Sequence, residues 1–183
     1  MSSDEHKLVK AHPHSFCPWC ASHLVKKLSD GRERLVCPNC DFIWYRNPIP
    51  ATGAILCRDN AILLVKRKYQ PRVGDWCFPA GFMEYDESPT ECCIRELKEE
   101  TGLDISITRL FWNYAGHDDP RSNAVLMIYL ADIIGGKLIA GDDASEVAFF
   151  ALDKIPSNIA FQAHRETIAD YKHFVATGHL PGE

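Results

Sequence analysis

The sequence predicts a mixed α/β sandwich preceded by a small cysteine-rich module. Three observations support this fold class: strand and helix patterns alternate along residues 47–183, two cysteine pairs lie near the N-terminus, and a proline-containing seam at residues 45–50 separates the two regions. We therefore expect a module over residues 1–46 with a flexible N-terminus, and an α/β domain over residues 47–183.

The composition is that of a globular protein. Of the 183 residues, 46% are hydrophobic and 25% are charged. The longest apolar stretches are far shorter than the ~20 residues that span a bilayer, and the N-terminus lacks the pattern of a signal peptide. With eight cysteines and no sign of a disulfide framework, we expect a cytoplasmic protein without a membrane partner.

The net charge of −5 is unevenly distributed. Residues 1–46 carry seven Lys/Arg and five Asp/Glu, whereas residues 47–183 carry 13 and 20. An acidic domain attracts nucleic acid weakly and needs cations to bind a polyanionic substrate. We expect a small-molecule nucleotide substrate and no nucleic-acid partner.

Four cysteines form two C-x2-C pairs separated by 16 residues: Cys17, Cys20, Cys37 and Cys40. Two pairs at this spacing favour a structural zinc site over a redox dithiol, which needs only one pair. A module of this size has too small a core to fold without such a clip. Four thiolates leave no open position on the Zn²⁺ ion, so we expect no catalysis there.

The zinc module has little net charge to offer a nucleic acid. Four thiolates and one Zn²⁺ contribute −2, which cancels the +2 of residues 1–46. A structural or dimer-forming role is therefore favoured for the module.

The larger domain is expected to begin with three strands. Residues 51–58 and 61–68 have strand patterns and are joined by a tight turn at Asp59-Asn60, and residues 76–80 form a third strand. The later elements are strands over residues 105–114, 123–132 and 147–152, and a helix over residues 161–177.

A helix between the third and fourth of these strands carries its own start and stop signals. Ser88 is the predicted N-cap, Pro89 takes the first helical position, and Glu91 completes a capping box. Gly102 suits the left-handed turn that ends a helix.

This helix carries three glutamates on one face. Glu96, Glu99 and Glu100 are spaced i, i+3 and i+4, so their like charges repel by a few tenths of a kcal/mol per pair. A hard cation with oxygen ligands, such as Mg²⁺, would compensate this repulsion. The alternative is a solvated acidic face.

Residues 81–103 match the pattern G-x5-E-x7-R-E-U-x-E-E-x-G-U, where U is aliphatic, at every fixed position. This pattern resembles that of the Nudix hydrolases, and the resemblance covers roughly residues 48–176. It implies a Nudix α/β/α sandwich with a mixed sheet, preceded by a zinc ribbon. It also implies Mg²⁺-dependent hydrolysis of a nucleoside diphosphate linked to another group.

The resemblance assigns metal ligands by position. Glu96, Glu99 and Glu100 would bind two or three Mg²⁺ (or Mn²⁺) ions, with a backbone carbonyl at Ala80 or Gly81 as a further ligand. The ions would orient a water molecule in line with one phosphorus atom.

It assigns supporting and catalytic roles to further charged residues. Glu87 and Arg95 would pair and brace the loop against the helix; the alternative is an ordinary surface ion pair. Glu146 would supply a late carboxylate, as a metal ligand or as the base, unless it is only a surface residue at a strand start. The base is left open among Glu99, Glu100 and Glu146.

Two branches of the family combine a four-cysteine ribbon with a Nudix domain. The NADH pyrophosphatases carry the motif S-Q-P-W-x-F-P-x-S, and residues 111–124 read FWNYAGHDDPRSNA instead. The chain resembles short zinc-ribbon proteins that include plant ADP-ribose/FAD pyrophosphatases, which implies AMP as a product and a possible homodimer. Hydrolysis of NADH or of NAD-capped RNA, and a non-catalytic nucleotide- or RNA-binding module, are the alternatives.

Four residues are candidates for contacts with the substrate. Phe82, Trp112 and Tyr114 offer rings for stacking on a base or flavin, although such rings are more often part of a core. Arg72 lies in a polar loop and is a candidate to bind a phosphate, although an exposed arginine usually contacts only water.

Overall fold

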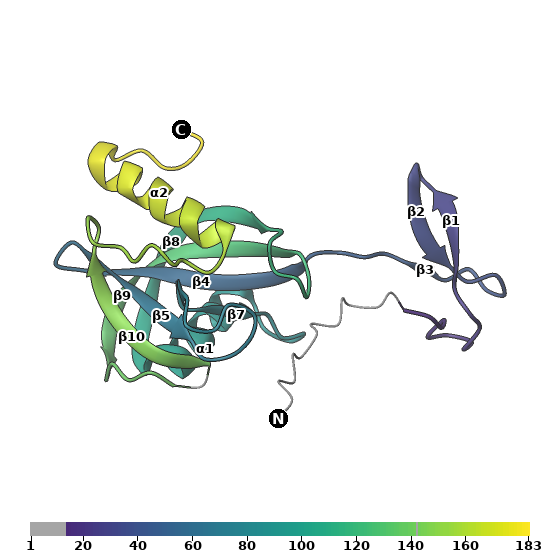
Figure 1. Cartoon of the computed structure of the whole chain (residues 1–183), viewed down its shortest axis with the longest axis horizontal. Helices are drawn as coiled ribbons and strands as arrows, with labels where there is room; N and C mark the ends of the chain where they lie inside the picture. The colour runs from purple at the N-terminus through teal and green to yellow at the C-terminus, as the bar shows by residue number, and fades with distance from the viewer. Residues whose placement is uncertain (1–13, 142) are drawn as a thin grey trace, which may run out of the picture. The chain divides into compact units, whose positions relative to one another are not determined.

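The computed structural model describes residues 14–141 and 143–183 (Figure 1). The chain divides into two compact units: one contains the residues up to Pro48 together with Pro120–Ser122, and the other contains Ile49–Asp119 and Asn123–Glu183. The division after Pro48 lies within the seam at residues 45–50. The expected flexible N-terminus concerns residues 1–13, which lie outside the described residues.

The smaller unit contains a three-stranded antiparallel sheet. Its strands are β1 (Val25–Ser29), β2 (Arg32–Val36) and β3 (Ile43–Trp44), in the order β1-β2-β3. Asp30 and Gly31 join β1 to β2, both with positive φ angles of 51° and 75°. Such angles are those of a two-residue hairpin turn that matches the twist of the flanking strands.

The larger unit is built on a mixed sheet of seven strands. Five of them follow the order β10-β5-β4-β9-β8, in which β4 and β9 are parallel and the other neighbours are antiparallel. The two short strands β6 and β7 pair with β5 and β4, respectively. The bounds are β4 (Ile49–Arg58), β5 (Ala61–Arg67), β6 (Trp76–Cys77), β7 (Ala80–Phe82), β8 (Leu103–Gly116), β9 (Ala124–Gly136) and β10 (Ala144–Ala151).

The prediction of one strand over residues 76–80 is wrong, because Phe78 and Pro79 separate β6 from β7. Proline has no N–H group to donate to a sheet ladder. The N–H group of Phe78 donates to Nδ1 of His164 at 3.1 Å, so it is not available to a neighbouring strand. The break therefore has a local cause at Pro79 and a tertiary one at His164.

The predicted signals of the first helix are confirmed in α1 (Pro89–Thr101). The Glu91 N–H donates to the Ser88 hydroxyl at 3.3 Å, and the Ser88 N–H donates to the Glu91 carboxylate at 2.8 Å. Gly102 follows with φ 71°. The second helix, α2 (Gln162–Thr177), ends at Gly178, which also has a positive φ.

The sheet separates two hydrophobic layers, as an α/β/α sandwich requires. On one side Ile55 of β4 packs in a core that includes Phe111 and Ile168 of α2. Its neighbour Leu56 faces the opposite side, in a core that includes Leu97 of α1. Alternate residues of β4 thus serve both layers. In Figure 1, α2 lies along one face of the sheet.

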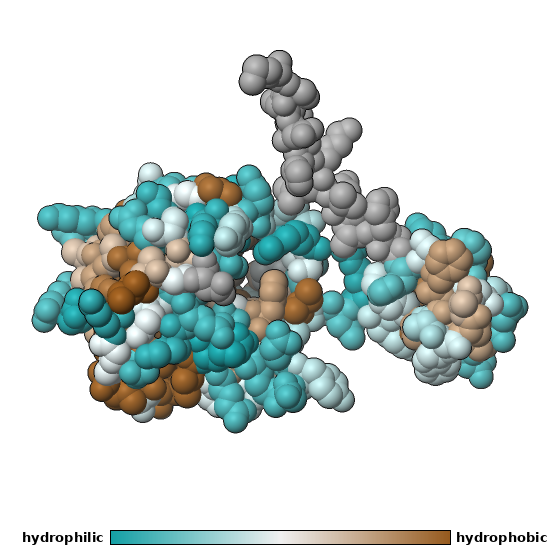
Figure 2. Space-filling view, turned by 90° about the horizontal axis from the view of Figure 1, so that it is seen from below, coloured by the Kyte–Doolittle hydropathy of each residue, from teal (hydrophilic) through white to brown (hydrophobic). Residues whose placement is uncertain are grey.

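The face drawn in Figure 2 carries many hydrophilic residues. Hydrophobic residues appear in Figure 2 as separate patches among polar ones. None of the helices in residues 14–141 and 143–183 is long and apolar enough to cross a membrane.

Candidate active site

Glu100 connects α1 to the short strand β7. Its side chain is buried, and its carboxylate accepts a hydrogen bond from the Ala80 N–H at 3.0 Å. This bond holds the carboxylate next to the backbone of Ala80 and Gly81, whose carbonyl groups were predicted to contribute a metal ligand.

Glu96 lies against the same backbone because residue 81 is glycine. A Cβ atom added to Gly81 would overlap the Glu96 carboxylate. The Glu96 side chain is only 15% exposed. The absence of a side chain at Gly81 therefore leaves the space in which this carboxylate sits.

Arg95 forms the expected pair with Glu87, through two hydrogen bonds. Nη2 lies 2.6 Å from one carboxylate oxygen and Nε lies 3.0 Å from the other, a geometry that gives strong ion pairs. The Arg95 guanidinium lowers the pKa of Glu87 to about 2. Nη2 also donates to the Phe82 carbonyl at 3.2 Å, so Arg95 holds the loop before α1.

Arg95 also contacts two of the three glutamates, which the sequence did not predict. Its Nη1 donates to Glu96 at 2.7 Å and to Glu99 at 3.1 Å. The arginine thus supplies positive charge to the carboxylates. Glu99 is the most exposed of the three glutamates, with 45% of its side chain accessible.

The electrostatics of the carboxylates fit a bound cation. Burial, aided by the negative charges of Glu96 and Asp143, raises the pKa of Glu100 to about 8, and burial raises the pKa of Glu96 as well. A divalent cation stabilises buried carboxylates that would otherwise repel each other. Mg²⁺ prefers oxygen ligands such as these carboxylates. The donor chemistry of these residues therefore fits the predicted Mg²⁺ or Mn²⁺.

Glu146 belongs to a different strand and a different ion pair. It lies within β10, where the predicted strand had begun one residue later, and its carboxylate is 3.2 Å from Nζ of Lys66 on β5. A register shift between Ala144 and Glu146 interrupts the pairing with β5. A bulge of this kind redirects the side chains beside it.

The carboxylates do not converge on one point. Among the described residues, the four cysteines are the only group of three or more His, Cys, Asp or Glu side chains whose ligand atoms all lie within 4.8 Å of one another. Glu96 and Glu99 are held by Arg95, and Glu146 is held by Lys66.

The candidate substrate contacts occupy different environments. Phe82 is 40% exposed and follows Gly81 directly. Arg72 is exposed in a loop with φ 66°. Trp112 is 43% exposed and lies beside Gly182 near the C-terminus. Tyr114 departs from the expectation, because it is buried in the core and its hydroxyl donates to Asp170 of α2 at 2.9 Å.

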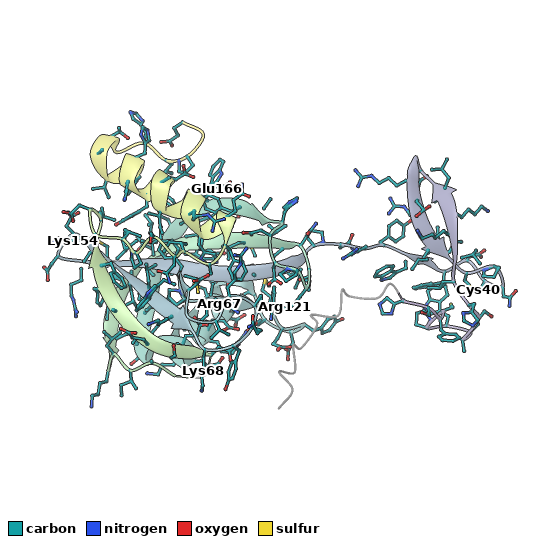
Figure 3. All side chains as sticks on the ribbon, in the orientation of Figure 1. Cys40, Arg67, Lys68, Arg121, Lys154 and Glu166 are labelled. Carbon is teal, nitrogen blue, oxygen red and sulfur yellow. The ribbon has the colours of Figure 1, made fainter. Side chains whose placement is uncertain are left out.

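Two residues near the site had no sequence signal. Arg67, labelled in Figure 3, is the last residue of β5; its Nε donates to the Pro71 carbonyl, and its guanidinium carbon lies 5.1 Å from the Phe161 ring centroid. His164 of α2 is buried, and desolvation lowers its pKa to about 4. Basic residues are common at strand ends, and histidines are common in amphipathic helices. Neither feature identifies a site residue in a single sequence.

The smaller unit brings its four cysteines together as predicted. The sulfur atoms of Cys20 and Cys37 are 3.4 Å apart, and that of Cys40, labelled in Figure 3, lies 3.6 Å from Cys17 and 3.7 Å from Cys20. Tetrahedral Zn²⁺ with Zn–S bonds of about 2.3 Å places sulfurs about 3.8 Å apart. The geometry therefore fits a zinc ribbon.

Two family models match the chain. The model described as NUDIX domain matches residues 47–171, and the zinc-ribbon model described as Nudix N-terminal matches residues 15–46. A solved NUDIX hydrolase from Nitrosomonas europaea has a TM-score of 0.79 and 29% identity, and the match covers 91% of this chain and 95% of that one.

Two characterised classes of protein are among the relatives. The ADP-ribose pyrophosphatase of Methanocaldococcus jannaschii is 43% identical over 128 residues, which are 69% of this chain and 75% of that protein. The NAD-capped RNA hydrolase NudC of Vibrio atlanticus is 29% identical over 167 residues, which are 86% of this chain and 58% of that protein. The chain thus matches only a little more than half the length of the second relative.

Proposed function

The chain belongs to the Nudix hydrolase family, and from this membership we propose that it hydrolyses the diphosphate bond of ADP-ribose and releases AMP. The observation that carries the choice of substrate is the 43% identity to an ADP-ribose pyrophosphatase over three quarters of that protein. FAD, which would yield AMP and FMN, is the second substrate of this proposal.

Three glutamates of α1 would hold the catalytic metal. Glu96, Glu99 and Glu100, with a carbonyl of Ala80 or Gly81, would bind Mg²⁺ or Mn²⁺. When bound, the ions would neutralise the diphosphate and lower the pKa of the attacking water.

The protein's own residues then position the reacting groups. The Ala80 N–H fixes the orientation of Glu100, and Arg95 holds Glu96 while it ties the preceding loop to α1. A carboxylate takes the proton of the attacking water, and we keep Glu99, Glu100 and Glu146 as the candidates for this base. Phe82 and Arg72, both exposed, are the proposed contacts to base and phosphate; Trp112 is a further ring available for stacking.

Glutamine substitutions test the assignment. We expect Glu99→Gln and Glu100→Gln to lower Mg²⁺-dependent AMP formation from ADP-ribose at least about a hundredfold, because a ligand or base is lost. Glu166→Gln makes the same exchange at an exposed position of α2, labelled in Figure 3, and serves as the matched control. Full activity in the two α1 variants would refute the proposed site.

A substrate panel tests the choice of substrate. Purified protein with Mg²⁺ would be given ADP-ribose, FAD, NADH and NAD-capped RNA in parallel, with AMP or cap release measured. The similarity to NAD-capped RNA hydrolases extends over 86% of the chain, so that activity is the second candidate. If NADH or capped RNA is hydrolysed fastest, that compound replaces ADP-ribose as the proposed substrate. If no compound is hydrolysed, a non-catalytic binding module is favoured.

We further propose a cytoplasmic homodimer. The eight cysteines are free thiols in the structure, as a reducing compartment requires. Light scattering coupled to size-exclusion chromatography would measure the mass in solution, and a monomer of 20.7 kDa would contradict the dimer.

A further inference from the structure

The register of the hairpin formed by β1 and β2 places three of its four cations on one face. Lys27 of β1 is paired with Arg34 of β2, and Ser29 is paired with Arg32. Residues directly opposite each other in an antiparallel pair point to the same face, as do residues two apart on one strand. Lys27, Arg32 and Arg34 therefore share one face of the sheet.

The acidic residue of the two strands lies on the opposite face, and a second acidic residue, Asp30, lies in the turn that joins them. Glu33 is the only Asp or Glu in β1 and β2, and it alternates with Arg32 and Arg34. Its carboxylate is 2.7 Å from Nζ of Lys26, so it is paired with a cation of its own face. No carboxylate of these two strands compensates the three cations opposite.

An aromatic ring extends the cationic face. The Arg34 guanidinium carbon lies 4.6 Å from the ring centroid of Tyr45, which follows β3. Tyr45 is 49% exposed. We call Lys27, Arg32, Arg34 and Tyr45 the basic face.

We propose that the basic face binds single-stranded nucleic acid. The three cations would contact phosphates of the strand, and one base would stack on the ring of Tyr45. Side chains of directly paired residues are about 5 Å apart, and the next pair on the same face lies about 7 Å along the strand. Three like charges this close repel each other, and a polyanion that passes along the hairpin removes the repulsion. A ring beside a cationic surface is the combination by which proteins bind single strands without reading their sequence.

The net charge of the zinc module did not predict this surface. That net charge is near zero, but it does not depend on the face that each side chain occupies. Alternation along β1 and β2 separates Lys27, Arg32 and Arg34 from the Lys26–Glu33 pair. The ribbon is therefore polarised although it is nearly neutral.

Two neighbouring lysines provide the test. The full-length, zinc-loaded protein would be titrated into a fluorescein-labelled 12-nucleotide oligoadenylate RNA, with fluorescence anisotropy measured between 50 and 200 mM salt. Each phosphate contact on a single strand contributes about −0.7 to the slope of log K against log salt, so we expect a slope of about −2. Lys27→Gln should reduce the slope by about 0.7, whereas Lys26→Gln removes the same charge from the opposite face and should leave it nearly unchanged.

A further variant and two controls complete the experiment. Tyr45→Ala should weaken binding roughly tenfold, because base stacking on an aromatic side chain is lost. Zinc content, measured for every variant, shows that the ribbon stays intact. ADP-ribose hydrolysis is measured separately, so a failed binding test is distinguishable from a failed enzyme assignment.

Three outcomes would overturn the proposal: no salt-dependent binding, equal effects of Lys26→Gln and Lys27→Gln, or Lys27-dependent binding to phosphatidylserine vesicles without binding to RNA. The last outcome would assign the face to a membrane surface instead.

Discussion

At the scale of single residues, Gly81 determines where the Glu96 carboxylate can lie. We expect Gly81→Ala to lower ADP-ribose hydrolysis at least about tenfold, because the new Cβ would displace this carboxylate. The displaced atoms are the end of a flexible side chain, so thermal stability should change little. Gly116→Ala is the matched control, since a Cβ there meets nothing closer than 3.4 Å. Equal activity of the two variants would contradict this reading of Gly81.

His164 makes stability depend on pH. Its pKa is about 4 in the folded protein against 6.5 ordinarily, so the unfolded chain binds the proton more readily. The free energy of unfolding therefore contains a contribution from neutral His164 that is complete above pH 6.5. This contribution, up to about 3 kcal/mol, is lost as the pH falls from about 6.5 to about 4.

Urea unfolding at pH 7.5 and pH 5.0 measures this effect. Between pH 7.5 and pH 5.0, the free energy of unfolding should fall by about 2 kcal/mol more in the wild type than in His164→Gln, because glutamine carries no titrating proton. His173→Gln, at an exposed position of the same helix, should behave like the wild type. The prediction is wrong if all three proteins lose the same free energy.

At the scale of elements, the N-terminus of α2 is capped by a residue distant in sequence. Phe161, the N-cap, has no capping side chain. The Asp118 carboxylate accepts instead from the Gln162 N–H at 2.9 Å and lies 3.3 Å from Nη2 of Arg165. Asp118 therefore connects the segment between β8 and β9 to α2, and a carboxylate at a helix N-terminus is favoured by the helix dipole.

Removal of this cap should destabilise the larger unit. We expect Asp118→Ala to lower the free energy of unfolding by about 1 kcal/mol, as measured by chemical denaturation. Asp153→Ala, at an exposed position, should cost less. Equal costs would show that the bond to Gln162 contributes nothing.

At the scale of the whole molecule, the two units are stabilised by different means. The larger unit has two hydrophobic layers, whereas the smaller one has a three-stranded sheet and four clustered thiols. We expect one zinc per chain, and its loss in Cys37→Ser should unfold the ribbon while the main unfolding transition persists. Elemental analysis and calorimetry would measure both, with Cys57→Ser as the control at an exposed cysteine outside the cluster. Full zinc content in Cys37→Ser would contradict the assigned ligands.

Short-range features were predicted from the sequence because their partners are close along the chain. The capping box of Ser88 and Glu91, the glycine stop of α1 and the Asp59-Asn60 turn, with φ angles of 52° and 58°, all involve neighbours within a few residues. The Glu87–Arg95 pair was predicted because a family pattern fixes its spacing.

Features decided by long-range packing were not predictable in this way. The parallel pairing of β4 with β9, the burial of Tyr114 against Asp170 and the cap that Asp118 gives α2 each join residues more than 40 positions apart. No local sequence pattern indicates which strand will pair with which other strand.

The sequence by itself determined the four clustered cysteines, the helix that carries the glutamates and the family, because each rests on fixed spacing along one segment. Only the tertiary structure decided which charges meet: Arg95 with Glu96 and Glu99, Glu100 with the Ala80 N–H, and Lys66 with Glu146. The physical reason is that electrostatic interaction depends on distance in space and on burial, and both are set only when the sheet and the helices pack together.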